Sequence, residues 1–341
     1  MRPLADAAVG RLRHLVDEPD LDGTPYRLGR EIARGGMGVV YEAVDERLDR
    51  KVALKVLHVA LAGPEHAARM VREARVVARL EHPGIVPIHD VGTLADGRVF
   101  YAMKLVEGRR LDQVPLGSIP EVLRLFEKLC EAVAFAHDRG VVHRDLKPAN
   151  VMVGAFGEVL VMDWGLAKLL AAPESEGGTE TGTGTATDTR VGTVMGTPGY
   201  MAPEQARGEI DRIGPRSDVY GLGMILRGLL AASPADDSAT RTWPPPAADA
   251  APAARELRPE VPKALAAIVA KATAEDPVAR YRDASDLVAD VRRLLDERPV
   301  AAYRESWLER LGRFLRRYRT PILLILTYLV VRALMLIFLG R

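Results

Sequence analysis

The first third of the chain alternates apolar and polar positions in short runs that are typical of β-strands. Strand-like runs begin at Tyr26 and read YRLGREIA, GVVYEAVDE and KVALKVL, and two more follow, GIVPIHDVG and RVFYAMKLV. Between them, PEHAARMVREARVVARL carries apolar residues at helical spacing. Residues 26–106 are therefore predicted to form a β-rich lobe with one main helix, after a short polar lead-in at residues 1–25.

Longer, helix-like segments dominate from about residue 107 onward. Residues 119–138 predict an amphipathic helix, and three more helices are predicted for SDVYGLGMILRGLLAA, VPKALAAIVAKATAED and DASDLVADVRRLLDE. Short strands are expected around VVHRD, VMV and VLVMD. A β-rich lobe followed by a helical lobe at about 107–295 is an α+β pattern.

One segment in the middle of the chain fits neither lobe. GGTETGTGTATDT spans Gly177 to Thr189, and no apolar residue larger than alanine interrupts it. A segment of such low hydrophobicity cannot bury enough surface to fold by itself, so we expect it to be disordered when unmodified.

Composition narrows the possible functions. The 341 residues carry a net charge of +1, which gives no sign of nucleic-acid binding. Cys130 is the only cysteine, which excludes an intrachain disulfide and a cysteine-rich zinc site. Only eight of the 47 basic residues are lysines, and Asn150 is the only asparagine. Lysines and this asparagine are therefore the first candidates for chemistry.

The stretch VVHRDLKPANVMV gathers several such candidates. It contains His143, Arg144, Asp145, Lys147 and Asn150, and Asp163 follows in MDWG. The Asn150 amide and the Asp163 carboxylate can hold a hard cation through oxygen. Asp145 can orient a hydroxyl and accept its proton, and Lys147 supplies a point charge for phosphate.

Upstream, IARGGMGVVYEA and VALK suggest a phosphate-binding region. Gly35, Gly36 and Gly38 lie between two predicted strands, where glycine allows backbone N–H groups to approach phosphate oxygens. Each feature also has a simpler explanation. The glycines fit a hairpin turn, Lys55 an exposed strand position, and Glu73 the solvated face of a helix.

Taken in order, the glycine loop, VALK, HRDLKPAN, DWG and GTPGYMAPE resemble the motifs of a protein kinase. The resemblance covers about residues 26–295, and HRDLKPAN is similar to the serine/threonine type. GGMGVVYEA and DPVARYRDASDLVADVRRLL resemble the bacterial eukaryotic-like (Hanks-type) branch. The resemblance implies a bilobal kinase fold, ATP and Mg²⁺ as cofactors, and protein substrates phosphorylated on serine or threonine.

The resemblance also implies a role for each matching position. Nucleotide binding is implied for Ala33, Gly35, Gly36, Gly38, Val40, Ala53, Lys55, Glu73, Met103 and Val106. Metal binding is implied for Asn150 and Asp163, and catalytic roles for Asp145, Lys147 and Thr197. Structural roles are implied for His143, Arg144, Trp164, Glu204, Asp218 and Arg280. Lys55 is expected to pair with Glu73, Glu204 with Arg280, and Asp218 to brace the catalytic loop.

The threonine tract then falls in the activation segment, between Asp163 and Glu204. Arg144 is the residue type that captures a phosphothreonine on such a segment. We therefore expect autophosphorylation, at Thr189 and Thr193 in particular, to order the segment. A second interpretation stays open, in which the tract is only a flexible spacer.

Several positions depart from the family pattern. Ala33 replaces the first loop glycine, which predicts reduced ATP affinity at most. Trp164 replaces the usual phenylalanine, and Lys104 lies where the hinge often has glutamate. A Pro/Ala-rich stretch at 231–254 replaces a recognisable substrate-docking region, which leaves substrate preference open.

Near the C-terminus, residues 321–339 predict a transmembrane helix. The run from Ile322 to Leu339 is 18 residues long and interrupted mainly by Arg332. It is about 27 Å long as a helix, near the minimum for a bilayer. The segment at 296–320 is rich in arginine, which predicts a cytoplasmic juxtamembrane position, and residues 303–319 within it are expected to lie on anionic lipid. The expectation is a single-pass inner-membrane protein with a cytoplasmic kinase; the alternative is a core helix docked on the kinase.

Three functions are compatible with these features. The first is an active serine/threonine kinase, whose tail helices could bring two copies together as a homodimer for phosphorylation in trans. The second is a membrane-tethered pseudokinase scaffold. Ala33 favours it, and it is opposed by the intact Lys55, Glu73, Asp145, Asn150 and Asp163. The third is a small-molecule kinase, against which GTPGYMAPE argues.

Overall fold

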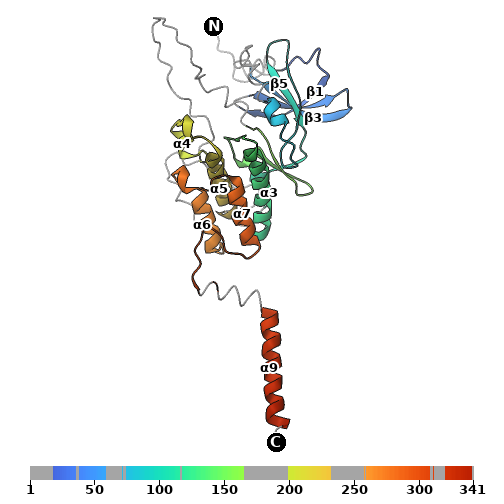
Figure 1. Cartoon of the computed structure of the whole chain (residues 1–341). Coiled ribbons are helices and arrows are strands. Elements are labelled where there is room, and N and C mark those ends of the chain that lie inside the picture. Colours follow the sequence, from blue (N-terminus) through green and yellow to red (C-terminus); the bar gives the residue numbers. More distant parts are fainter. Residues whose placement is uncertain are drawn as a thin grey trace, which may run out of the picture.

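The computed structural model contains two lobes and a separate C-terminal helix (Figure 1). It describes residues 18–35, 38–58, 71, 74–115, 117–164, 199–231, 257, 259–307, 310 and 319–339. The α+β organisation predicted from the sequence is confirmed, since strands dominate the first lobe and helices the second.

The N-lobe is built on a five-stranded antiparallel sheet in the order β1-β2-β3-β5-β4. Its strands are β1 (Tyr26–Gly35), β2 (Gly38–Asp45), β3 (Arg50–Leu57), β4 (Ile88–Thr93) and β5 (Val99–Lys104). Alternation along β5 gives the sheet two apolar faces. Phe100 and Ala102 pack in a cluster confined to the N-lobe, whereas Tyr101 and Met103 belong to the cluster that continues into the C-lobe.

The C-lobe packs helices around one buried core. Its main helices are α3 (Ile119–Asp138), α5 (Pro215–Ala231), α6 (Lys263–Ala272) and α7 (Ala284–Leu295). At the start of α3, the Glu121 side chain accepts a hydrogen bond from the Ser118 N–H at 2.8 Å, which caps the helix. Buried leucines such as Leu129, Leu222 and Leu287 fill the space between the helices.

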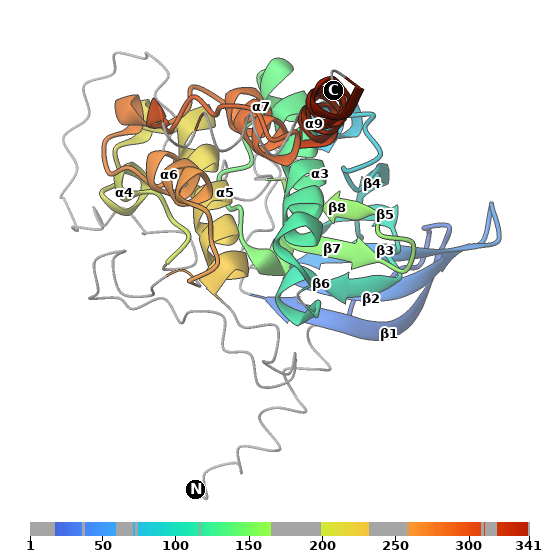
Figure 2. The same cartoon turned by 90° about the horizontal axis from the view of Figure 1, so that it is seen from below.

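A small sheet lies beside α3 and carries the loops of the site (Figure 2). It pairs β6 (Gly108–Arg110), β7 (Val151–Gly154) and β8 (Val159–Val161) in that order. Strand β6 was not predicted, because its three residues are all exposed and show no apolar alternation.

The strand predicted around VVHRD is wrong. Residues 141–145 run without a paired strand, and the N–H groups of His143 and Arg144 bond instead to the Asp218 carboxylate. A side chain thus takes the donors that a neighbouring strand would have used.

The chain after α7 folds back onto the C-lobe. The buried Asp290 carboxylate accepts hydrogen bonds from the N–H groups of Ala301 and Ala302, at 2.8 and 3.0 Å, and from the Tyr281 hydroxyl at 3.0 Å. Val300 is buried against the core. C-lobe packing therefore continues at least to Tyr303, which also packs against this core.

Helix α9 (Arg319–Leu339) projects beyond the C-lobe (Figure 1). Several side chains described within it, including Leu323, Leu326 and Leu329, are more than half exposed. Among the residues that the structure describes, no helix combines the length and apolar composition needed to cross a bilayer. The transmembrane segment at 321–339 stays a prediction.

Candidate active site between the lobes

Lys55 and Asp163 join the two lobes at the centre of the site. Lys55 lies in β3, and its Nζ is 2.6 Å from Oδ1 of Asp163, which follows β8. Tyr101 of β5 is the cross-strand partner of Lys55, and its hydroxyl donates to the same Asp163 oxygen at 3.4 Å. A cation, a carboxylate and a phenol therefore converge from three strands or strand ends.

The protonation states of this group follow from its surroundings. Burial by itself would lower the pKa of the Lys55 ammonium, but Tyr101 and Asp163 outweigh burial and raise that pKa above its ordinary value. Burial raises the pKa of Tyr101 to about 12. Near neutral pH, Lys55 is a cation and Tyr101 keeps its proton to donate.

Asp145, Lys147 and Asn150 lie together in the loop between α3 and β7. Lys147 Nζ is 3.1 Å from Asp145 Oδ2, and the Asn150 amide nitrogen donates to the Asp145 carbonyl at 2.9 Å. The backbone carbonyl of Asn150 in turn accepts a hydrogen bond from the N–H of Met162, the residue before Asp163, at 2.9 Å. These bonds bring Asp145, Asn150 and Asp163 into one cluster.

Asp218, buried in the first turn of α5, holds the backbone of this loop. Its carboxylate accepts from the N–H groups of His143 and Arg144 at 2.7 and 2.8 Å. His137 Nε2 lies 2.9 Å from the same carboxylate. Because the Ala284 N–H donates to His137 Nδ1 at 3.3 Å, Nε2 carries the proton and donates to Asp218. The predicted brace is present, and it also ties α3 and α7 to the loop.

His143 and Trp164 pack against one another beneath the loop, with ring centroids 4.9 Å apart. The Asp145 N–H donates to His143 Nδ1 at 3.2 Å, so Nε2 donates to the Met162 carbonyl at 2.9 Å. Burial lowers the pKa of His143, which is neutral at pH 7. The contacts of His143 and Trp164 are therefore structural.

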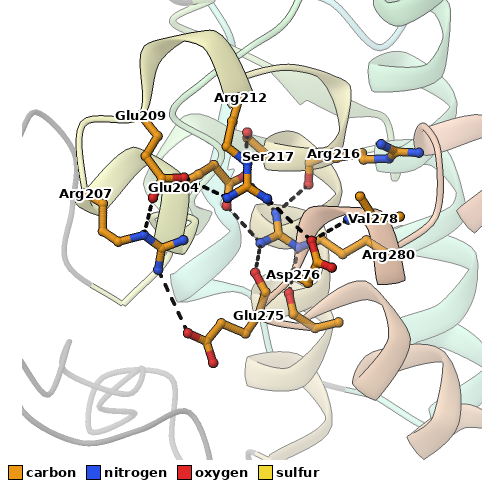
Figure 3. Close-up of polar contacts among 11 residues, drawn as sticks. Glu204, Arg207, Glu209, Arg212, Arg216, Ser217, Glu275, Asp276, Val278 and Arg280 are labelled. Atoms are coloured by element: carbon orange, nitrogen blue, oxygen red, sulfur yellow. Dashed lines mark hydrogen bonds and ion pairs between the residues drawn. The ribbon is translucent and has the colours of Figure 1, made fainter.

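Glu204 and Arg280 form the buried pair that the sequence predicts (Figure 3). Arg280 donates to both Glu204 oxygens, and the Ser217 hydroxyl donates to one of them at 2.7 Å. Burial by itself would raise the pKa of Glu204, but the bonds from Arg280 and Ser217 hold it below the usual value. The pair fixes α4 (Pro203–Ala206) against α5 and the segment before α7.

The positions predicted to bind nucleotide gather on the N-lobe sheet. Ala33 pairs with Val40, Val40 also pairs with Lys55, and Ala53 pairs with Met103. Val40, Ala53, Met103 and Val106 all belong to the apolar cluster that continues into the C-lobe. Ala33 has no positive φ, so its methyl group is compatible with the strand.

Two of the loop glycines differ in their surroundings. Gly35 and Gly38 face each other across the end of the hairpin. A Cβ on Gly38 would lie 2.3 Å from the Val56 carbonyl oxygen, whereas a Cβ on Gly35 would meet nothing within 4 Å. Close backbone approach therefore requires glycine at Gly38.

Five predicted site residues lie outside the described part of the chain. They are Gly36, Glu73, Thr189, Thr193 and Thr197. The pairing of Lys55 with Glu73 and the roles of the three threonines stay predictions.

The described residues fit a divalent metal through oxygen. Asp163 Oδ1 is held by Lys55 and Tyr101, while Oδ2 accepts no hydrogen bond from any described residue. The side-chain amide nitrogen of Asn150 donates to Asp145. Among the described residues, none donates a hydrogen bond to its side-chain amide oxygen. Within the described ranges, no group of three or more His, Cys, Asp or Glu side chains is placed to hold a metal ion. This sparse oxygen set suits Mg²⁺, which takes few protein ligands.

Sequence reasoning missed three residues of the site. Tyr101 contacts Asp163, and His137 contacts Asp218. The third is Gln205, whose side chain donates to the Arg144 carbonyl at 2.8 Å. Tyr101 lies two residues before Met103 on the same strand, so strand alternation could have placed it on the site's face. Gln205 also lines a small pocket next to Asp145, together with Tyr200 and Met201.

Comparison with known proteins gives a consistent result. Residues 26–276 match the family described as protein kinase domain. The serine/threonine-protein kinase PknD of Protochlamydia amoebophila is 36% identical over 304 residues, which cover 80% of this chain and 30% of that protein. The probable serine/threonine-protein kinase PknB of Lactococcus lactis is 39% identical over 274 residues, which cover 78% of this chain and 41% of that protein. This chain therefore spans less than half the length of these curated relatives.

A solved structure shows the same fold. The crystal structure of the Mycobacterium tuberculosis PknI kinase domain superposes with a TM-score of 0.56 at 27% identity, covering 79% of this chain and 96% of that one.

Proposed function

This chain belongs to the protein kinase family, in its bacterial serine/threonine branch, and we propose that it transfers the γ-phosphate of ATP to serine and threonine hydroxyls of proteins. The observation that carries the proposal is the convergence of Lys55, Asp163, Asp145 and Asn150 between the lobes. Phosphoryl transfer requires positioning and charge stabilisation above all, and this cluster supplies both.

Each residue has a role that its geometry supports. The Lys55 cation binds nucleotide phosphates, and it is delivered to the lobe interface by β3. The Asp145 carboxylate orients the acceptor hydroxyl and accepts its proton. Lys147, 3.1 Å from that carboxylate, places positive charge where the transferring group would pass.

Asn150 and Asp163 would hold Mg²⁺ through the amide oxygen and Oδ2. Bound there, Mg²⁺ would neutralise charge on the phosphates during transfer. Asn150 is fixed for this role by its bond to Asp145, and Asp163 by Lys55 and Tyr101.

Autophosphorylation of the activation segment, at Thr189 and Thr193, is part of the proposal. Its support is the threonine-rich sequence and the position of Arg144 beside Asp145. The Arg144 backbone is held on both sides, by Asp218 at its N–H and by Gln205 at its carbonyl. A phosphothreonine bound by this arginine would order the segment.

The final part of the proposal is attachment to the cytoplasmic membrane through α9, with the kinase in the cytoplasm. The run from Ile322 to Leu339 and the arginines of residues 303–319 support it, as does the exposure of the described α9 leucines. Carbonate-washed membranes should retain the full chain. They should release a variant with Leu326→Asp and Leu329→Asp, since charge opposes insertion. Equal retention of both proteins would reject attachment through α9.

The kinase proposal is tested by peptide mass spectrometry of the full-length chain, in detergent micelles, after incubation with Mg²⁺ and ATP. Wild type should gain phosphate on threonines of residues 179–193, and Asp145→Asn should gain none. Asp49→Asn, an exposed turn position, is the matched control and should behave as wild type. Binding of ATP without any phosphate transfer, to itself or to a generic protein substrate, would instead indicate the pseudokinase scaffold.

A further inference from the structure

Tyr101 is a buried polar residue of the site for which the proposed phosphoryl transfer gives no role. It lies directly opposite Lys55 on β5, and only 3% of its surface is exposed. Lys55 Nζ lies 5.8 Å from the centre of its ring. The phenol therefore faces the Lys55–Asp163 contact from a fixed position inside the N-lobe.

The two oxygens of Asp163 are used differently. Lys55 and Tyr101 both bind Oδ1, at 2.6 and 3.4 Å, and among described residues nothing donates to Oδ2. Two donors on one oxygen restrict the rotation of the carboxylate and leave the other oxygen available for a metal ion. A hydrogen bond that orients a metal ligand typically affects metal affinity by tenfold or more.

The two donors are not equivalent during a reaction cycle. Lys55 has a long side chain with four rotatable bonds and must also bind nucleotide phosphates under the proposed function. Tyr101 is held by the β3–β5 register and the packed face of the sheet, so its hydroxyl stays near Asp163. When Lys55 turns to a phosphate, Tyr101 is the donor that remains.

We propose that Tyr101 is a positioning residue that orients the Asp163 carboxylate for Mg²⁺ binding, an inference that rests on the proposed kinase function. Tyr101→Phe keeps the ring and removes only the donor. Its Mg²⁺ requirement for nucleotide binding should rise, while nucleotide binding without metal should stay close to wild type.

The test is calorimetric titration of the full-length chain with a non-hydrolysable ATP analogue over a series of Mg²⁺ concentrations. Tyr101→Phe should need about tenfold more Mg²⁺ for half-maximal enhancement of binding. Tyr26→Phe is the matched control, because Tyr26 is also buried in the N-lobe and its hydroxyl donates to Asp90 at 2.9 Å. This control should keep the wild-type Mg²⁺ dependence.

These outcomes distinguish a failure of the proposed role of Tyr101 from a failure of the proposed kinase function. An unchanged Mg²⁺ dependence in Tyr101→Phe, with a normal response in wild type, overturns the inference alone. Equal loss of metal-free and metal-dependent binding would show a merely structural role and would also overturn it. No Mg²⁺-dependent nucleotide binding in wild type would reject the proposed function and this inference together.

Discussion

Arg280 meets Glu204 through two hydrogen bonds, of 2.8 and 2.9 Å, and neither side chain is exposed to solvent. Arg280 also donates to the carbonyls of Ala274, Glu275 and Arg216. A single guanidinium therefore satisfies a buried carboxylate and three backbone oxygens. The position of α4, which contains Glu204 at the end of the activation segment, depends on this guanidinium.

Replacing Arg280 with methionine should lower the free energy of unfolding by about 3–5 kcal/mol, because Glu204 would keep a buried charge without its partner. Arg212→Met is the control from the same region (Figure 3), since Arg212 makes half-exposed ion pairs with Glu209 and Asp276. That change should cost less than about 1 kcal/mol. Urea denaturation measures both, and equal losses would contradict the assignment.

Replacing Asp218 with asparagine should lower kcat by about 100-fold, because a shifted catalytic loop misplaces Asp145. An asparagine side chain offers one acceptor and presents its amide to the N–H groups of His143 and Arg144. The exposed Asp211→Asn should leave kcat unchanged. Turnover of a generic protein substrate tests this, and wild-type turnover in Asp218→Asn would rule out the brace.

Replacing Gly38 with alanine should destabilise the protein by about 1–3 kcal/mol, because the new methyl group would clash with the Val56 carbonyl across the β2–β3 pair. Gly35→Ala, at the position directly opposite Gly38 in the hairpin, meets open space and should change stability little. Thermal unfolding without nucleotide separates this steric effect from nucleotide binding. A larger loss in Gly35→Ala would contradict the structure.

Stability should fall as the pH drops below about 6.5, in part because of His143. Burial lowers the pKa of His143 in the folded state, so below the unfolded pKa only the unfolded chain binds a proton there. Folding is then favoured above that pH and weakened below it. His143→Gln should be less stable overall but should remove up to about 1.4 kcal/mol per pH unit from the slope of stability against pH just below pH 6.5. Parallel curves for both proteins would show that His143 does not cause the slope.

The sequence predicted most of the strands and helices, because their apolar spacing is local. Residues 119–138 form a helix with the predicted limits, and all five strands of the N-lobe sheet overlap the predicted runs, with ends that differ by a few residues at most. The motif residues could also be found, since Asp145, Lys147 and Asn150 are defined by close spacing along the chain.

The rest depends on contacts between residues far apart in sequence. Tyr101 reaches Asp163 across 62 residues, and His137 reaches Asp218 across 81. Neither pairing has a local signal. The failed strand at residues 141–145 has the same cause, because its apolar pattern did not reveal that Asp218 would take its donors.

Asp290 also determines where the kinase domain can be trimmed. Its carboxylate is buried and uses the N–H groups of Ala301 and Ala302. A cut directly after Leu295 would strip both donors from a charge inside the C-lobe, whereas a cut after Ala302 would keep them. Tyr303 also packs against the core. Limited digestion of the tail should therefore stop no earlier than Tyr303, and the shortest autonomous folding unit should extend past the last helix of the C-lobe.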